Sequence, residues 1–271
     1  MTSRTFLASA LFALMLTATV PAQAGVGDLL VAPTRIILDG SRGTEIILKN
    51  EGNEVATYRI SVELRRMKAD GTFEDVAQPS EREITARDMI VYAPRRVTLP
   101  PKQPQSIRLS ARVPQGLPDG EYRVHLLFRA VPPPRPAVQT PADFKGIGFA
   151  LTPIYGVTIP VIVRLGNLEA TAGIAGVALT KEQGKPAVTM QLSRAGSRST
   201  YGEIRITRPG VAEPLAAQKG IAVYTELNAR SVTVPIDDKF ANAAAGPVRV
   251  EYIETTDGIS RTLAETQAVL R

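Results

Sequence analysis

The residue types that most often perform catalysis are scarce in this chain. His125 is the single histidine, and there is no cysteine. A Ser-His-Asp arrangement needs its histidine in a cleft between a nucleophile and a carboxylate. His125 instead alternates with Val124 and Leu126, so we expect it to face solvent or the outer face of a sheet. A zinc site needs several nitrogen or sulfur ligands, so the sequence predicts neither nucleophilic catalysis nor a metal site.

Paired carboxylates could serve glycoside hydrolysis, and the chain contains three such pairs. They are Glu74-Asp75, Asp237-Asp238 and Glu251 with Glu254, all in turn-like or strand-end segments beside basic residues. This setting is typical of solvated charges. Phosphate-binding glycine loops and calcium-loop spacings are absent as well. We therefore expect no enzyme activity, no cofactor and no small-molecule substrate.

The charge balance argues against nucleic acid as a partner. The chain has 32 Lys and Arg against 26 Asp and Glu, and these charges are scattered rather than gathered into a stripe. Only 5% of the residues are aromatic, which leaves few platforms for stacking bases. A mildly basic protein could still favour acidic protein partners.

The first 24 residues have the order of a secretory signal peptide. Arg4 precedes an apolar run from Phe6 to Val20, and Ala22-Gln23-Ala24 supplies a small-residue cleavage signal. The run is shorter than the ~20 apolar residues of a membrane span. We expect residues 1–24 to be removed and the rest of the chain to be exported to the periplasm.

The remaining chain is patterned as two all-β domains. Short, alternating, β-branched segments are separated by turn clusters, as in a β-sandwich. A proline-rich loop covers 131–143, and Leu165-Gly166-Asn167 resembles a linker before a second series of strands. We therefore predict an N-terminal domain over 25–165 and a C-terminal domain over 166–271, with no helix of useful length after the leader.

Two features stand out from this pattern. Arg35 lies among buried-type residues of the first strand, where a charge is costly unless it is paired or reaches a cleft; the alternative is an arginine that extends to solvent at a sheet edge. The second feature is a row of large apolar residues of one parity that follows the proline-rich loop: Ile147, Phe149, Leu151, Tyr155 and Val157. On an exposed edge such a row favours pairing with another chain, including a second copy of this one.

Four segments resemble the PapD-like periplasmic chaperones of pilus and fimbrial assembly. They are 32–36 (APTRI), 47–50 (ILKN), 92–109 with its Tyr-Ala-Pro start, and 117–133, which opens with LPDGE and closes with VPP. The resemblance is good over 27–166 and looser over 167–271.

The resemblance implies two immunoglobulin-like β-sandwich domains set at an angle, with a cleft between them. It implies a chaperone that donates the seventh strand of its first domain to a pilus subunit and delivers the subunit to an outer-membrane usher. Arg35 matches the cleft arginine that holds the subunit's C-terminal carboxylate. Glu121, Arg164 and Asp257 occupy places that match the family's interdomain salt bridge.

The chain departs from the family at one anchor. Counting back from Arg164, the family's cleft lysine falls at Pro160. Either another group completes the anchor or Arg35 holds the carboxylate alone. The competing interpretations of the whole chain are a structural pilin or adhesin subunit, or another exported immunoglobulin-like binding module.

Overall fold

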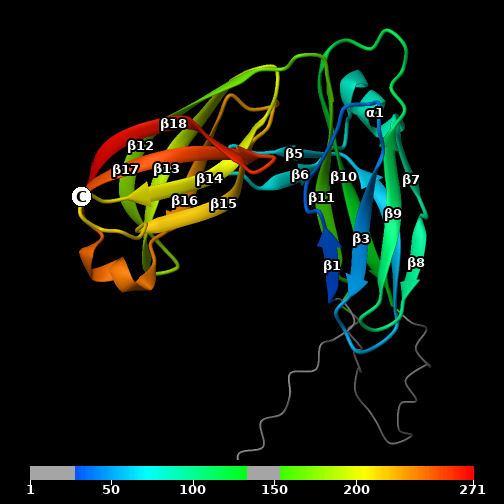
Figure 1. Cartoon of the computed structure of the whole chain (residues 1–271), viewed down its shortest axis with the longest axis horizontal. Coiled ribbons are helices and arrows are strands. Elements are labelled where there is room, and N and C mark those ends of the chain that lie inside the picture. Colours follow the sequence, from blue (N-terminus) through cyan, green and yellow to red (C-terminus); the bar gives the residue numbers. More distant parts are fainter. Residues whose placement is uncertain (1–27, 133–152) are drawn as a thin grey trace, which may run out of the picture.

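The computed structural model describes residues 28–132 and 153–271, which form two β-sandwiches joined end to side. In Figure 1 the strands of one sandwich run roughly across those of the other. This arrangement confirms the predicted fold class of two immunoglobulin-like domains set at an angle.

The first sandwich packs a four-stranded sheet against a five-stranded one. The first sheet has the order β1-β3-β9-β7 and the second β2-β11-β10-β4-β8. The strands are β1 (Leu29–Ala32), β2 (Ile36–Leu38), β3 (Thr44–Asn50), β4 (Ala56–Glu63), β7 (Ile90–Ala93), β8 (Arg96–Leu99), β9 (Pro104–Ala111), β10 (Gly120–Val131) and β11 (Gly156–Leu165).

The second sandwich packs a three-stranded sheet, β12-β13-β16, against a four-stranded one, β15-β14-β17-β18. Its strands are β12 (Ala170–Glu182), β13 (Lys185–Gly196), β14 (Thr200–Thr207), β15 (Ala216–Val223), β16 (Ala229–Pro235), β17 (Gly246–Thr256) and β18 (Ile259–Leu270). The chain crosses between the sandwiches after Leu165, where Gly166 adopts a positive φ of 79°.

Alternation of apolar residues explains where the first core lies. Tyr58 and Ile60 on β4 are buried, and so are Val124, Leu126 and Phe128 on β10. Side chains two apart on a strand share a face, so the two strands present one continuous apolar surface to the opposite sheet. The second sandwich has its own core, which contains Val188, Leu192, Ile206, Val250 and Tyr252 among others.

Within residues 28–132 and 153–271, two short helices interrupt the strands. The expectation of no useful helix is wrong at α1 (Glu81–Asp88). Its N-terminus carries a capping box, in which the Ser80 side chain accepts from Glu83 N and the Glu83 side chain accepts from Ser80 N. The other is the 3₁₀ helix η1 (Asp238–Ala243), which lies between β16 and β17.

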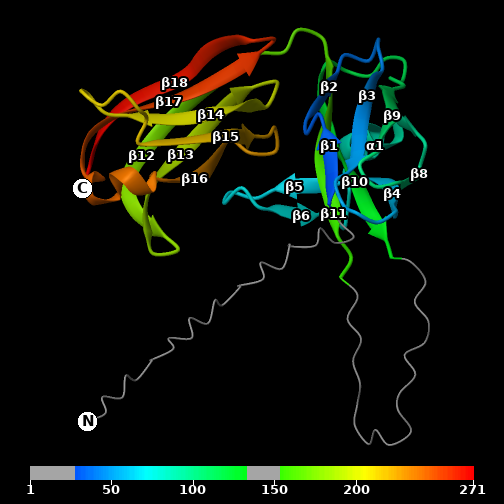
Figure 2. The same ribbon diagram turned by 60° about the horizontal axis from the view of Figure 1, so that its bottom comes forward.

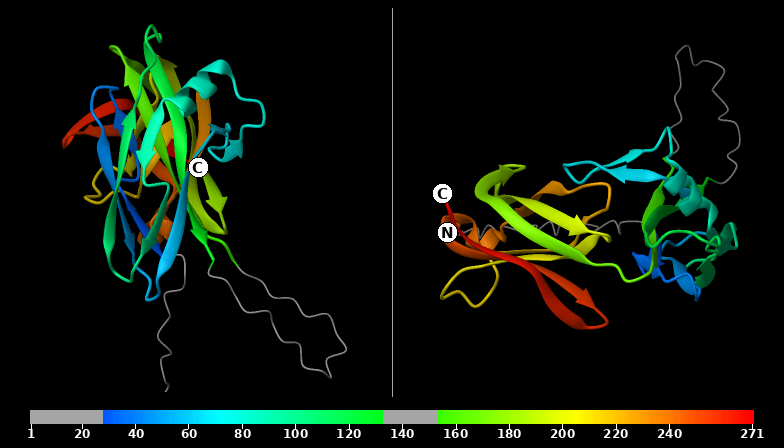
Figure 3. Two further views of the ribbon diagram at one scale, coloured as in Figure 1. Left: turned by 90° about the vertical axis from the view of Figure 1, so that its right-hand side faces the viewer. Right: turned by 90° about the horizontal axis from the view of Figure 1, so that it is seen from above.

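A hairpin of β5 (Arg65–Met67) and β6 (Phe73–Asp75) leaves the first sandwich and reaches the second (Figures 2 and 3). Near its tip Ala69 accepts a hydrogen bond of 2.8 Å from Ser231 N in β16. Met67 packs in a small cluster with Ile162 of β11 and with Ala222 and Tyr224 of the second sandwich. The two domains therefore share buried surface as well as a linker.

Candidate binding edge and interdomain cleft

The strand that follows the predicted loop has an edge that is only partly covered. β11 lies between β10 and β2, but β2 pairs only with Val161–Val163. Among the described residues, 156–160 have a strand partner on the β10 side alone. An uncovered strand edge presents backbone donors and acceptors to any chain that lies beside it.

The pairing register shows which groups this edge presents. Ala130 N donates to Tyr155 O at 2.9 Å, and Arg129 lies opposite Gly156. In an antiparallel ladder hydrogen-bonded pairs alternate with pairs that do not bond. The backbone groups at Gly156, Thr158 and Pro160 therefore point away from β10. Pro160 lacks an N–H, and its position means that no bond to β10 is lost.

The side chains of this segment differ from the predicted stripe. Val157 packs against the core of the first sandwich and Ile159 is buried in it, because their parity on β11 faces the opposite sheet. Tyr155, directly before the strand, is 54% exposed. Ile147, Phe149 and Leu151 lie outside the described residues.

Arg35 lies at the junction of the two domains, just before β2. Its Nη1 donates to Tyr224 Oη and its Nη2 to Ser199 Oγ, both at 3.3 Å. The guanidinium carbon lies 4.3 Å from the ring centroid of Tyr201, a distance typical of a cation–π contact. No carboxylate within residues 28–132 and 153–271 forms an ion pair with this half-buried arginine.

Glu121 and Arg164 lie together beneath Arg35. Arg164 Nε donates to Glu121 Oε2 at 3.0 Å, and the Glu121 side chain is fully buried. The same oxygen accepts from Ser199 N at 3.0 Å and Ser199 Oγ at 2.9 Å. Burial lowers the pKa of Arg164, and the charge of Glu121 opposes that effect. Both charged residues belong to the first domain, so the link to the second domain runs through Ser199.

Asp257 is not brought into this network. It occupies the exposed turn between β17 and β18 with a φ of 52°, and no hydrogen bond joins it to Arg164. A different carboxylate lies close by, since Glu254 pairs with Arg198 through two contacts of 2.8 Å. Ser199, Tyr201 and Tyr224 escaped sequence reasoning, because nothing in their own spacing marks them as neighbours of Arg35. Glu254 was expected to be a solvated charge, but its side chain is largely buried against Arg198.

His125 is buried, contrary to the expectation that it faces solvent. It is 4% exposed, because Phe73 of the β5–β6 hairpin covers it with ring centroids 5.1 Å apart. Arg123 Nη1 lies 3.4 Å from His125 Nε2. An arginine can only donate, so Nε2 accepts and the neutral ring carries its proton on Nδ1. Burial, followed by the nearby charges of Arg123 and Arg65, lowers the pKa of His125 to about 3.

This buried histidine predicts a pH effect on stability. Its pKa falls from 6.5 to about 3 on folding, so below about pH 6.5 the unfolded chain binds a proton that the native state does not. The free energy of unfolding should therefore decrease between about pH 6.5 and pH 3, by up to ~1.4 kcal/mol per pH unit from this group. Urea unfolding of the protein and of His125→Gln at about pH 7.5 and pH 5 measures it. An equal decrease in both proteins would contradict the assignment.

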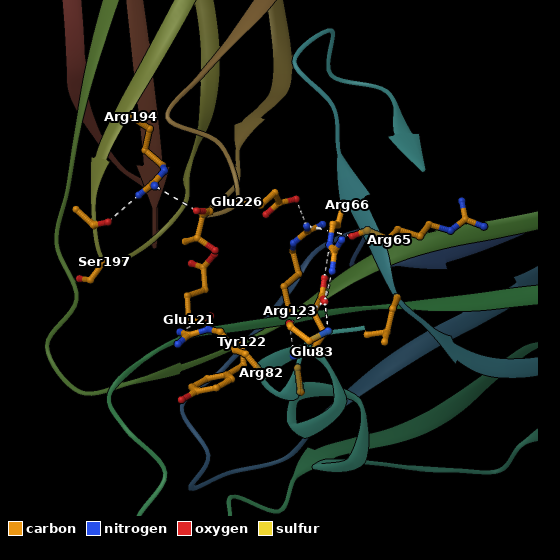
Figure 4. A pocket seen from close by; sticks show the side chains of 15 residues that line it. Arg65, Arg66, Arg82, Glu83, Glu121, Tyr122, Arg123, Arg194, Ser197 and Glu226 are labelled. Carbon is orange, nitrogen blue, oxygen red and sulfur yellow. Dashed lines mark hydrogen bonds and ion pairs between the residues drawn. The ribbon is translucent and has the colours of Figure 1, made fainter. Parts of the chain in front are cut away.

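A hollow lies on the α1 side of the domain junction, with a cavity volume of about 370 Å³. Figure 4 shows several arginines and glutamates around it. Arg66 pairs with Glu83 at 2.6 Å, and Arg123 pairs with Glu226 of the second domain. Arg194 donates to four backbone carbonyls of its own domain. The Arg123–Glu226 pair therefore links the two domains, whereas Arg66 and Arg194 bind partners within their own domains.

The described part of the chain, residues 28–132 and 153–271, holds no group of three or more histidine, aspartate or glutamate residues arranged to bind a metal ion. None of its helices has the length and apolar character needed to span a membrane.

Comparison with solved structures returns chaperones. The E. coli chaperone DraB is 15% identical, with 91% of this chain and 98% of that one covered and a TM-score of 0.48. The YadV chaperone is 14% identical, with 90% and 100% covered and a TM-score of 0.45. The SafB chaperone, solved with the Salmonella enterica SafA pilin, is 15% identical, with 91% and 98% covered and a TM-score of 0.44. No family model and no curated protein sequence matches the chain.

Proposed function

We propose that this protein is a periplasmic chaperone that binds pilus or fimbrial subunits by pairing the free edge of β11 with a strand of the subunit. It then delivers the subunit to an outer-membrane usher, and it performs no chemistry of its own. The resemblance of 27–166 to the PapD-like chaperones supports this proposal, and so does the geometry of the edge. The uncovered edge could also pair two copies of the free protein.

One observation carries the proposal: the free edge of β11 ends at Arg35. β2 is parallel to β11, with Ile36 opposite Val161. Arg35 directly precedes β2, which occupies the edge of β11 from Val161 onward. A strand that pairs with 156–160 would therefore have to end at Arg35. Five residues at ~3.3 Å each give an edge of roughly 16 Å.

Charge sets the direction of such a partner strand. A strand parallel to β11 would bring its C-terminal end to Arg35, whereas an antiparallel strand would bring its N-terminal end there. A carboxylate is attracted to the guanidinium, and an ammonium group is repelled by it. We therefore expect a parallel strand that terminates in a free carboxylate.

A proline scan of β11 tests the edge directly. Thr158→Pro removes an N–H that points away from β10, so the fold should keep its ladder while a partner strand loses a donor. An unsatisfied backbone acceptor costs ~1–3 kcal/mol, which is roughly a 5- to 150-fold loss in affinity. The measurement is the amount of subunit that copurifies from the periplasm, set against the midpoint of thermal unfolding.

Two matched variants complete this experiment. Ile159→Pro removes an N–H that points toward β10 and should lower the unfolding midpoint. Thr158→Ala controls for the lost side chain and should retain the subunit. Full subunit recovery by a folded Thr158→Pro protein would show that this edge is not the binding site.

A further inference from the structure

The Arg35 guanidinium is held by the opposite domain. Its two hydrogen bonds go to Tyr224 Oη and Ser199 Oγ, and the aromatic ring beneath it belongs to Tyr201. All three residues lie in the second sandwich or directly before its β14 strand, whereas Arg35 belongs to the first. The position of this arginine therefore depends on the contact between the domains.

Ser199 is itself oriented by a buried charge. Its hydroxyl donates to Glu121 Oε2 at 2.9 Å, so the oxygen lone pairs remain for donors. Arg35 Nη2 and Arg164 Nη2 both donate to Ser199 Oγ, at 3.3 Å and 3.4 Å. Glu121 thus fixes the serine, and the serine fixes one arm of Arg35.

Tyr224 and Tyr201 restrict the remaining freedom of the guanidinium. Tyr224 is only 4% exposed and packs with Met67 and Ile162, so its hydroxyl is a rigid acceptor for Nη1. The Tyr201 ring covers one face of the guanidinium plane. The N–H groups that remain lie in the plane of the fork, where they can bind a carboxylate with two parallel hydrogen bonds.

We propose that Ser199, Tyr201 and Tyr224 are positioning residues that hold Arg35 ready for the terminal carboxylate of a partner strand. This inference rests on the proposed function and extends it to the second domain. The first domain supplies the charge and the strand edge, and the second supplies the orientation, so a chain end is recognised only when both domains are in place.

The first test follows the arginine itself and needs no partner. NMR relaxation of the Arg35 Nε–H group should show an ordered side chain in the wild type. Ser199→Ala, Tyr224→Phe and Tyr201→Leu should each increase its motion on the picosecond-to-nanosecond timescale. Ser193→Ala, an exposed serine on β13, is the matched control and should leave the signal unchanged. Equal order in the wild type and all three variants would overturn the proposal.

The second test asks whether orientation matters for binding. The probes are two synthetic strand peptides of alternating valine and threonine with a lysine tail at the N-terminus, one ending in a carboxylate and one in an amide. The wild type should prefer the carboxylate peptide by roughly tenfold. In Tyr224→Phe and Ser199→Ala the ratio of the affinities for the carboxylate and amide peptides should fall toward one. The loss should come from weaker binding of the carboxylate peptide.

The outcomes separate the two proposals. A wild type that binds neither peptide contradicts the proposed edge function. If the wild type binds both peptides with equal affinity, the proposed edge function stands. The carboxylate site and the positioning role are then both contradicted. A full carboxylate preference in the folded variants contradicts the positioning role alone.

Discussion

Replacing Arg35 with alanine is expected to abolish the proposed subunit capture while the protein stays folded. Arg35 has no carboxylate partner among the described residues and lies where the free edge of β11 stops. Losing a hydrogen-bonded charge pair at a half-buried site costs ~2–5 kcal/mol, which is roughly 30- to 5,000-fold in affinity. The measurement is the yield of subunit that copurifies with equal amounts of each protein.

The control for this variant is Arg108→Ala. The Arg108 side chain is 87% exposed on β9, in the sheet of the first sandwich that does not contain β11. The substitution therefore removes the same charge from a solvated site. Capture should be unaffected by it. Unimpaired capture by a folded Arg35→Ala protein would remove Arg35 from the binding site.

The largest expected effect on stability comes from Glu121→Ala. This fully buried carboxylate accepts from Arg164 and from both the backbone and the hydroxyl of Ser199. Its removal leaves the partly buried Arg164 charge without a counterion, and breaking a buried pair in this way costs ~3–5 kcal/mol. Urea unfolding at neutral pH measures the loss of free energy of unfolding.

Glu45→Ala provides the comparison for this loss. Glu45 is more than half exposed and lies 3.9 Å from Arg108, and exposed pairs contribute only ~0–1 kcal/mol. A loss in Glu121→Ala no greater than in Glu45→Ala would show that the interdomain junction does not depend on this carboxylate.

The fold could be predicted from sequence because its signal is local. Alternation placed Tyr58 with Ile60 and Val124 with Leu126 on common faces, and all four are buried. The helix α1 was missed because it spans only eight residues and so has no long apolar period. Its start depends on a capping box between Ser80 and Glu83.

The candidate site was less accessible to sequence reasoning, because it depends on contacts between distant segments. His125 is buried only because the β5–β6 hairpin folds back over its strand with Phe73. The hydroxyls that hold Arg35 lie more than 160 residues away along the chain. Local periodicity carries no information about such pairs, whereas β11, which ends at Leu165, could be located by its own apolar pattern.

The β5–β6 hairpin limits how freely the two halves can be separated or exchanged. Met67 and Phe73 belong to the first half of the chain, but Tyr224 of the second half covers part of their apolar surface. A truncated first domain would expose Met67 and Ile162 to water and favour aggregation. A chimera with a foreign second domain would meet the same problem unless Tyr224 were transferred with it. The evolutionary unit in this protein is therefore the pair of domains, and substitutions at Tyr224 are constrained by the sequence of a hairpin more than a hundred residues earlier.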